Sequence, residues 1–509
     1  MAIKSSEESQ RGINVYLSNP WYLIKSGYLI LTWIVMGIHL ELVGPTMPIL
    51  ASNVNVDYSG MGSALALRAA GYLIANISAA FLQNIVKKHS EGLLICAFVL
   101  PAIAVFSTSF VTSFIIMCFL FFIQGVAQGL TDLGGTNILL TMWGANAAAP
   151  LNSAHLGYGI GAVIVNLLVR PFLSQTSSPS SSNNLINNNE EINSTLSSVD
   201  SRLTKSSIVI PYSITALLCL LTAGGHLFFY IKEQKSQRER LEIEQADYAA
   251  VSTNQTTESH LRTKDNYSPY SPRTCGRGFF QYGLTLSIIF ICYTFFIGGN
   301  DQTFSKFFFT YLKSDKFNIS TQTAISATIL YWLSYSIGRL MGAILSVFLS
   351  VNICLDIVWV GGFCLAIAWF IFVWFIGLTS TSLFILGSAT GLVFSPIFPL
   401  SFGLFNQRLN VVPMLLASLL CGSAVGAITL QKIAGFVMDR NPKHFPTLLI
   451  VCLLMSILFY IGSNFVYFIH QRKNLLDARP SITDGAALPP EHINEEEQQM
   501  ATYLRDQID

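Results

Sequence analysis

The stretch FFIQGVAQGLTDLGGTNILLTMWG, residues 121–144, carries the pattern that decides the fold. It is long and apolar enough to cross a bilayer, which takes roughly 20 residues. Gln124, Gln128 and Asp132 nevertheless recur within it every four residues, so they share one side of a helix. Polar groups at membrane depth are costly and usually face a bundle interior or an aqueous path. The stretch therefore predicts a membrane helix that faces a polar cavity.

The composition of the whole chain agrees with a membrane protein. Of its 509 residues, 52% are hydrophobic and only 11% are charged, whereas soluble globular proteins carry about 25% charged residues. The net charge of +1 gives no reason to expect a nucleic-acid partner. No P-loop, HExxH or GxSxG motif occurs, so nothing indicates an enzyme. We also expect no cofactor, and a monomer in the lipid bilayer.

A hydropathy window of bilayer length finds twelve apolar segments. They lie at 24–50, 60–85, 91–110, 112–142, 148–173, 207–231, 280–311, 323–348, 353–377, 381–405, 411–434 and 446–469. The charged stretch 232–279 separates two groups of six, and the Ser- and Asn-rich stretch 174–206 interrupts the first group. The predicted fold is therefore an all-α membrane protein with twelve transmembrane helices in two six-helix halves, 24–231 and 280–469.

Orientation follows from the positive residues near the segment ends. Lysine and arginine gather on the side that holds residues 1–23, the linker 232–279 and the tail 470–509, so we predict this side to be cytoplasmic. The Ser- and Asn-rich loop then lies outside the cell. Two glycosylation sequons, which begin at Asn193 and Asn318, fall on the outer side. We therefore predict a multi-pass plasma-membrane glycoprotein with both termini in the cytoplasm.

Three glycine motifs repeat between the halves. The pairs are GVAQGL (125–130) with GSATGL (387–392), GYGIGA (157–162) with GSAVGA (422–427), and RAAG (68–71) with RLMG (339–342). Each match alone is a generic packing pattern of small residues, but three matches in corresponding segments indicate an internal duplication. Transporters built from such repeats bind their solute near the membrane midplane, between the repeats.

Two other segments carry polar groups at membrane depth. Glu41 precedes Gly44-Pro45, where a proline interrupts the helix and frees backbone carbonyls for a cation or a solute. A packing kink, with Glu41 paired to Arg68, would explain the same residues equally well.

The seventh segment has a flexible polar centre. Asp301 and Gln302 lie just after a pair of glycines in this aromatic segment, where they can gate a path and hold solute hydroxyls. Trp332 in the next segment offers an aromatic face for a sugar ring, although ordinary packing explains it as well. Lys306, nearer the end of the seventh segment, is expected to extend toward the membrane interface.

Five stretches resemble one known family. They are LVGPTMPILASNVN (42–55), LRAAGYLIAN (67–76), GLTDLGGTNILLTMWG (129–144), AHLGYGIGA (154–162) and YWLSYSIGRLMGA (331–343). These stretches resemble the sodium-dependent glucose transporter family of the major facilitator superfamily, also called major facilitator domain-containing protein 4. Asp132 and Asn137 match its helix-4 motif, and His155 matches its helix-5 histidine. Glu41, at a usually uncharged position, and Lys306, in place of a small residue, depart from the family pattern.

The resemblance implies a secondary transporter that takes up a hexose such as glucose together with sodium. We expect the driving cation at Asp132 or Glu41, with sodium possible at Asp132 and a proton as the alternative ion. Solute contacts are expected from Gln124, Gln128, Asn137, Asp301, Gln302 and Trp332. Arg68, Arg339 and His155 are expected to act as gate or scaffold residues. Two alternatives are a proton-coupled transporter of another small polar solute and a transporter-like receptor or scaffold without transport.

Overall fold

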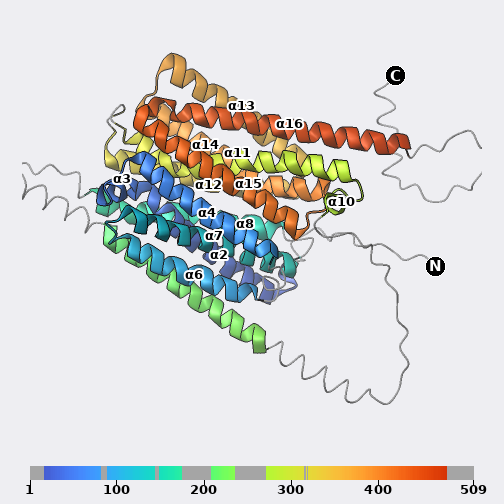
Figure 1. Ribbon diagram of the computed structural model, residues 1–509, viewed down its shortest axis with the longest axis horizontal. Coiled ribbons are helices and arrows are strands. Elements are labelled where there is room, and N and C mark those ends of the chain that lie inside the picture. Colours follow the sequence, from blue (N-terminus) through green and yellow to red (C-terminus); the bar gives the residue numbers. More distant parts are fainter. Residues whose placement is uncertain are drawn as a thin grey trace, which may run out of the picture. The chain divides into compact units, whose positions relative to one another are not determined.

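The computed structural model describes residues 16–81, 89–143, 148–174, 208–235, 271–314, 317 and 319–477. Within these residues every regular element is a helix (Figure 1). They are α2 (Pro20–Glu41), α3 (Val43–Asn53), α4 (Tyr58–Phe81), α6 (Ser90–Thr108), α7 (Phe114–Trp143), α8 (Ala148–Ser174), the unlabelled green helix Ile208–Lys235, α10 (Pro272–Cys275), α11 (Phe280–Leu312), α12 (Thr321–Phe348), α13 (Val351–Ile371), η3 (Phe372–Ile376), α14 (Ser380–Arg408), α15 (Pro413–Arg440), η4 (Pro442–His444) and α16 (Phe445–Asp477).

These elements make twelve membrane helices in the described part of the chain. The short helix α3 completes the span begun by α2, and the π-helical turn η3 extends α13. Ten spans are long and apolar enough to cross a membrane by composition alone. The remaining two, α4 and α12, contain Arg68 and Arg339 and many small polar residues, which lower their hydropathy. The predicted all-α fold with twelve helices is confirmed.

The first span is interrupted, as predicted, but at Leu42 rather than at Gly44-Pro45. Pro45 has no N–H to donate to the carbonyl four residues earlier, so the effect appears one turn before the proline. The Thr46 hydroxyl lies 2.7 Å from the Leu42 carbonyl and 2.9 Å from the Tyr212 hydroxyl. The interruption is therefore stabilised by side chains within the same half.

The internal duplication appears in the packing of equivalent helices. α8 packs on α2 in the first half, as α15 packs on α11 in the second. A Cβ added to Gly157 would lie 2.6 Å from the Ile30 carbonyl oxygen, and one added to Gly422 would lie 2.7 Å from that of Ile291. The repeated glycines therefore allow the same close backbone approach in both halves.

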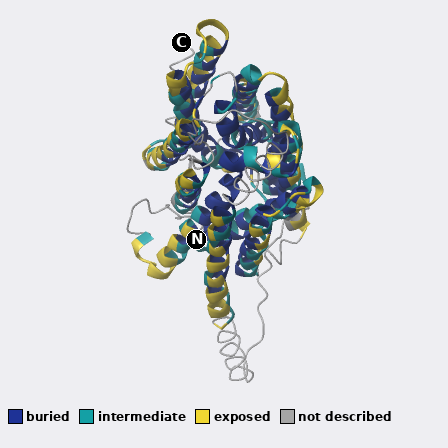
Figure 2. Cartoon of the chain, turned by 90° about the vertical axis from the view of Figure 1, so that its left-hand side faces the viewer, coloured by how far each residue is buried: buried dark blue, intermediate teal, exposed yellow. Residues whose placement is uncertain are grey.

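The two halves meet along their interior helices. α4 packs on α15, α8 packs on α12, and α3 packs on α11. Figure 1 shows α4 and α15 side by side, with α6, the helix Ile208–Lys235 and α13 toward the periphery. Exposed residues lie on the outward faces of the helices and buried residues in the interior (Figure 2). Apolar residues dominate the outward faces, with Ile115 79% exposed, as expected for surfaces that contact lipid.

Several helices extend beyond their predicted boundaries. α2 begins at Pro20, the helix Ile208–Lys235 enters the predicted linker, and α16 continues to Asp477 in the predicted tail. A hydropathy window ends with the last apolar residue, whereas backbone hydrogen bonding continues through polar ones. The sequon residues Asn193 and Asn318 lie outside the described residues.

Candidate functional site

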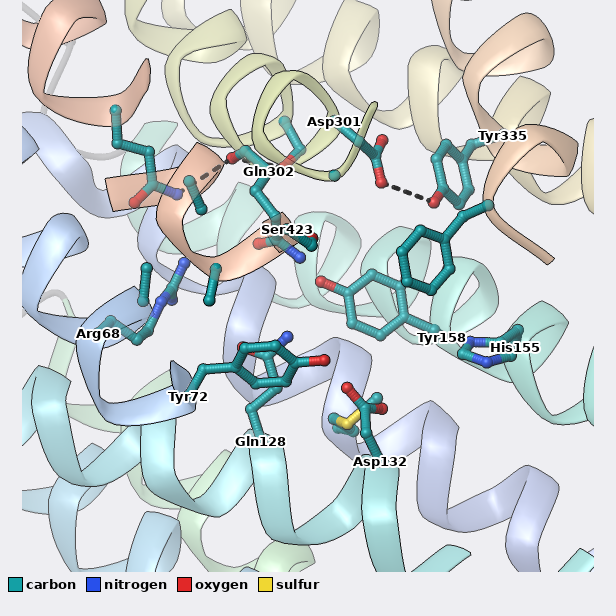
Figure 3. A pocket seen from close by; sticks show the side chains of 18 of the residues that line it. Arg68, Tyr72, Gln128, Asp132, His155, Tyr158, Asp301, Gln302, Tyr335 and Ser423 are labelled. Carbon is teal, nitrogen blue, oxygen red and sulfur yellow. Dashed lines mark hydrogen bonds between the residues drawn. The ribbon is translucent and has the colours of Figure 1, made fainter. Parts of the chain in front are cut away.

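A cavity of about 90 Å³ lies between the two halves. Its lining comes from α2, α4, α7 and α8 of the first half and from α11, α12, α14 and α15 of the second. Asp132 and Ser423 lie near the middle of their helices, so the cavity is at mid-depth in the bundle (Figure 3). Its polar and aromatic lining residues include Arg68, Tyr72, Gln128, Asp132, His155, Tyr158, Asp301, Gln302, Trp332, Tyr335, Arg339, Ser423 and Gln431.

The second half contributes a chain of three polar side chains. Arg339 Nη2 donates to the Tyr335 hydroxyl over 2.8 Å, and this hydroxyl donates to Asp301 Oδ2 over 3.1 Å (Figure 3). The other carboxylate oxygen, Asp301 Oδ1, is buried without a hydrogen-bond partner among the described residues, and so are Arg339 Nε and Nη1. Buried polar atoms rarely stay unpaired, so these three atoms are available to a ligand in the cavity.

The first half contributes a carboxylate with a different environment. Asp132 and Gln128 line the cavity from α7, and Tyr72 directs its hydroxyl toward Asp132 (Figure 3). In the described part of the chain, no lysine, arginine or histidine forms an ion pair with Asp132. His155 also lines the cavity, and its ring packs edge-on against Trp33 at 5.8 Å. Asp132 is therefore a carboxyl group at mid-depth without an ion-pair partner among the described residues.

Aromatic rings form one wall of the cavity. Trp332, which is 2% exposed, lies edge-on to both Tyr158 and Tyr335, with ring centroids 5.9 Å and 5.1 Å away. All three residues line the cavity. The wall combines flat apolar faces with phenol hydroxyls, which suits a ligand that has both apolar faces and hydroxyl groups.

Glu41 lies beside the cavity and not in its lining. Its carboxylate oxygen Oε1 forms an ion pair with Lys306 and accepts a hydrogen bond from the Tyr158 hydroxyl. Arg68 instead donates to the Leu40 carbonyl over 3.2 Å, so the pairing of Glu41 with Arg68, one of the two interpretations of the sequence, does not occur. The expectation that Lys306 extends to the membrane interface was also wrong, because its side chain is fully buried. A buried carboxylate is the better partner for this ammonium group.

Two residues expected to contact the solute lie outside the cavity lining. Gln124 is 1% exposed, and its Nε2 lies 3.4 Å from Thr108 Oγ1 on α6. Asn137 Nδ2 donates to Ser90 Oγ, also on α6, over 2.8 Å. Around the axis of α7, Gln124 is rotated by about 40° from Gln128, and Asn137 is rotated by about 140° from Asp132. Both side chains therefore point from α7 toward α6 instead of toward the cavity.

No role was assigned from the sequence to Tyr72 and Tyr335, the tyrosines that accompany the two arginines. Tyr72 lies four residues after Arg68, and Tyr335 lies four residues before Arg339. Residues four apart are neighbours on a helix surface, and all four line the cavity. An arginine–tyrosine pair on each of the equivalent helices α4 and α12 was the signal that could have identified them.

One end of the bundle is closed by contacts between the halves. Asp439 on α15 accepts hydrogen bonds from the backbone N–H groups of Tyr58 and Ser59, over 3.0 and 2.7 Å, at the start of α4. Lys432 Nζ lies 2.6 Å from Ser63 Oγ and 3.2 Å from the Ser59 carbonyl. We call this end, which includes the turn 54–57, the Asp439 end. In the predicted topology it is extracellular.

Two repeated helical halves around a buried polar cavity define a membrane transporter and not an enzyme. Comparison with known families agrees, because the model of the Major Facilitator Superfamily matches residues 29–428. The chain belongs to this superfamily.

Curated relatives and solved structures resemble the chain at low identity. The human sodium-dependent glucose transporter 1 is 29% identical over 143 residues, 28% of this chain, and the match spans only 27% of the human protein. The mouse sodium-dependent glucose transporter 1A is 20% identical over 425 residues, 82% of this chain and 90% of that protein. The E. coli fucose:proton symporter has a TM-score of 0.57 at 15% identity, with 87% of this chain and 99% of that chain covered. A nucleoside transporter has a TM-score of 0.52 at 15% identity, with 86% and 99% covered. The solved structures show the fold alone.

Proposed function

We propose that the chain is a secondary active transporter that carries a hexose across the plasma membrane by alternating access, coupled to sodium. The observation that carries the proposal is the mid-depth cavity between the halves, which has unpaired polar atoms on one side and a carboxyl group without an ion-pair partner on the other. Binding at the interface of two repeats lets their relative rocking expose one site to either side in turn. The names of the curated relatives support glucose and sodium.

The second half has the chemistry to hold a sugar. Hexose hydroxyls both donate and accept hydrogen bonds. Asp301 Oδ1 can accept from one hydroxyl, while the free nitrogens of Arg339 can donate to another. Gln302 adds an amide to the same lining, and Trp332 covers a ring face. A solute without hydroxyls would leave these buried atoms unpaired, at a cost of about 1–3 kcal/mol each.

The first half has the chemistry to hold the driving cation. Hard cations prefer oxygen ligands, and the Asp132 carboxylate and the Gln128 amide offer such oxygens from neighbouring turns of α7. Glu41 is the weaker choice for this role, because Lys306 already neutralises its charge. Asp132 is the only acidic residue in α7, so it is the oxygen ligand on this helix that can also balance the charge of a bound cation.

Uptake into proteoliposomes that contain the purified full chain tests the solute and the ion separately. Labelled glucose should accumulate when sodium is outside, and replacing sodium with choline at fixed pH should abolish accumulation. Excess unlabelled hexose should compete, whereas a nucleoside should not. Accumulation that ignores sodium and follows an inward pH gradient would show a proton symporter, and no uptake under either gradient would refute hexose transport.

The Asp132→Asn variant tests the coupling residue. It should lose sodium-driven accumulation while keeping normal surface expression and hexose exchange. Asp57→Asn is the matched control, because Asp57 is an exposed carboxylate in the turn 54–57 that accepts from the Gly60 N–H. Normal sodium-driven uptake by Asp132→Asn would refute the assignment of the ion site.

A further inference from the structure

The Glu41–Lys306 ion pair joins the two halves of the protein. Glu41 is the last residue of α2 and Lys306 lies on α11. The two side chains are 2% and 0% exposed, and the Tyr158 hydroxyl donates to the same carboxylate oxygen that contacts the ammonium group. Three helices from both halves therefore converge on one buried pair of charges.

The pair lies between the cavity and the Asp439 end. Tyr158 and Ser305, which neighbour the pair, line the cavity. On the other side, the chain continues from Glu41 through α3 to the turn 54–57 at the Asp439 end. One turn beyond Lys306, the Thr310 hydroxyl contacts Met47 Sδ at 3.6 Å. The helices of the two halves are thus in contact from the pair onward, and the path is closed at this level.

Such a pair is stable out of water only while both charges are present. The attraction between two buried charges offsets the cost of removing them from water, and one charge left alone is strongly destabilising. If the halves separate at the Asp439 end, water reaches both groups and the need for pairing disappears. The pair therefore favours the state in which this end is closed.

We propose that the Glu41–Lys306 pair is the lock that holds the path shut toward the Asp439 end and breaks each time that end opens. While the pair is formed, the ammonium group of Lys306 balances the charge of Glu41, so the driving cation does not bind there. Tyr158 connects this lock with the cavity, because its ring lines the cavity while its hydroxyl holds Glu41. The proposal rests on the proposed alternating access but not on the identity of the solute.

A cysteine reporter tests the lock without any solute. Ser305→Cys places a thiol in the cavity beside Lys306, and a membrane-impermeant thiosulfonate reagent is applied to the full-length protein from each side of the membrane. Glu41→Gln and Lys306→Met each leave one buried charge that is better solvated in the open state. Each should therefore raise labelling from the Asp439 side by at least roughly tenfold. The charge exchange Glu41→Lys with Lys306→Glu should return labelling toward the original rate.

Lys25→Met is the matched control. Lys25, with its side chain 14% exposed, forms an ion pair with the buried Glu91 at 2.9 Å, and both residues belong to the first half. A general loss of stability would raise labelling in this control as well, whereas loss of the lock would not. Unchanged labelling in both single variants, or equal labelling in the Lys25→Met control, would overturn the proposal. Failure of the charge exchange to lower the labelling again would overturn it too.

A second variant avoids any unpaired charge. Glu41→Cys combined with Lys306→Cys removes both charges, and a short bifunctional thiosulfonate reagent can bridge the two thiols. Bridging should stop glucose uptake, and a reducing agent should restore it. Continued uptake by the bridged protein would show that the two positions need not separate. If the original protein takes up no glucose, the labelling experiment still tests the lock, so the two proposals fail independently.

Discussion

Replacing Gly435 with alanine should hold the Asp439 end partly open. A Cβ at this position of α15 would lie 2.5 Å from the Tyr58 carbonyl oxygen and 3.1 Å from Ser59 Cα on α4. Ordinary contact begins at 3.4 Å, so the two helix backbones would have to separate by roughly 0.9 Å. Overpacking of this kind costs about 1–3 kcal/mol. Because the strain disappears when the helices separate, the cost falls on the closed state alone.

The closed-to-open ratio should therefore fall by roughly 5- to 150-fold. The Ser305→Cys reporter, labelled from the Asp439 side, measures this change as an increase in labelling rate. Gly462→Ala is the control, because no heavy atom lies within 4 Å of the position its Cβ would take. Equal labelling rates in Gly435→Ala and Gly462→Ala would refute the conclusion that the path closes where α4 meets α15.

Three further predictions concern the site, the topology and the linker. Tyr335→Phe should weaken glucose binding about tenfold in a competition assay. The Tyr335 hydroxyl bridges a guanidinium and a carboxylate, and hydrogen bonds to charged groups contribute about 1.5–3 kcal/mol. Unchanged affinity would contradict the proposed solute contacts. Asn193→Gln with Asn318→Gln should remove a glycosidase-sensitive gel shift, and a shift that persists would contradict the topology. In a variant in which Cys275 is the only cysteine, maleimide should react with its thiol slowly at neutral pH and faster after denaturation. The reason is that burial raises the pKa of the Cys275 thiol. Equal reaction rates before and after denaturation would exclude the burial of Cys275.

The sequence was sufficient to predict the twelve helices and the duplication, because both depend on local patterns. A hydropathy window detects an apolar span wherever it occurs, and the glycines of GYGIGA and GSAVGA mark close helix contacts that both halves repeat. Asp132, Asp301 and Trp332, which line the cavity, were predicted from local patterns as well. Each is a polar or large aromatic residue in a segment that could cross the membrane without it.

The partners of these residues could not be predicted from one sequence. Glu41 and Lys306 lie on helices of different halves, and no local pattern indicates which buried acid meets which base. Gln124 and Asn137 show the limit of periodicity itself. A helical face is broad, and only the neighbouring helix, here α6, decides whether a side chain points to a cavity or to a packing contact.

The low hydropathy of α4 and α12 has a consequence for biosynthesis. Each helix contains an arginine, which costs about 2.5–3.5 kcal/mol at the centre of an inserting segment, and neither qualifies as a span by composition. Each is also synthesised before the helix that covers it, since α4 packs on the later α7 and α12 on the later α14. During translation these two segments must therefore stay beside the insertion machinery, or beside earlier helices, until their cover emerges from the ribosome. Because α12 also packs on the earlier helix α8, whereas both main partners of α4, the helices α7 and α15, come later, the interval after α4 is the one in which an arginine-bearing segment waits without its packing partners.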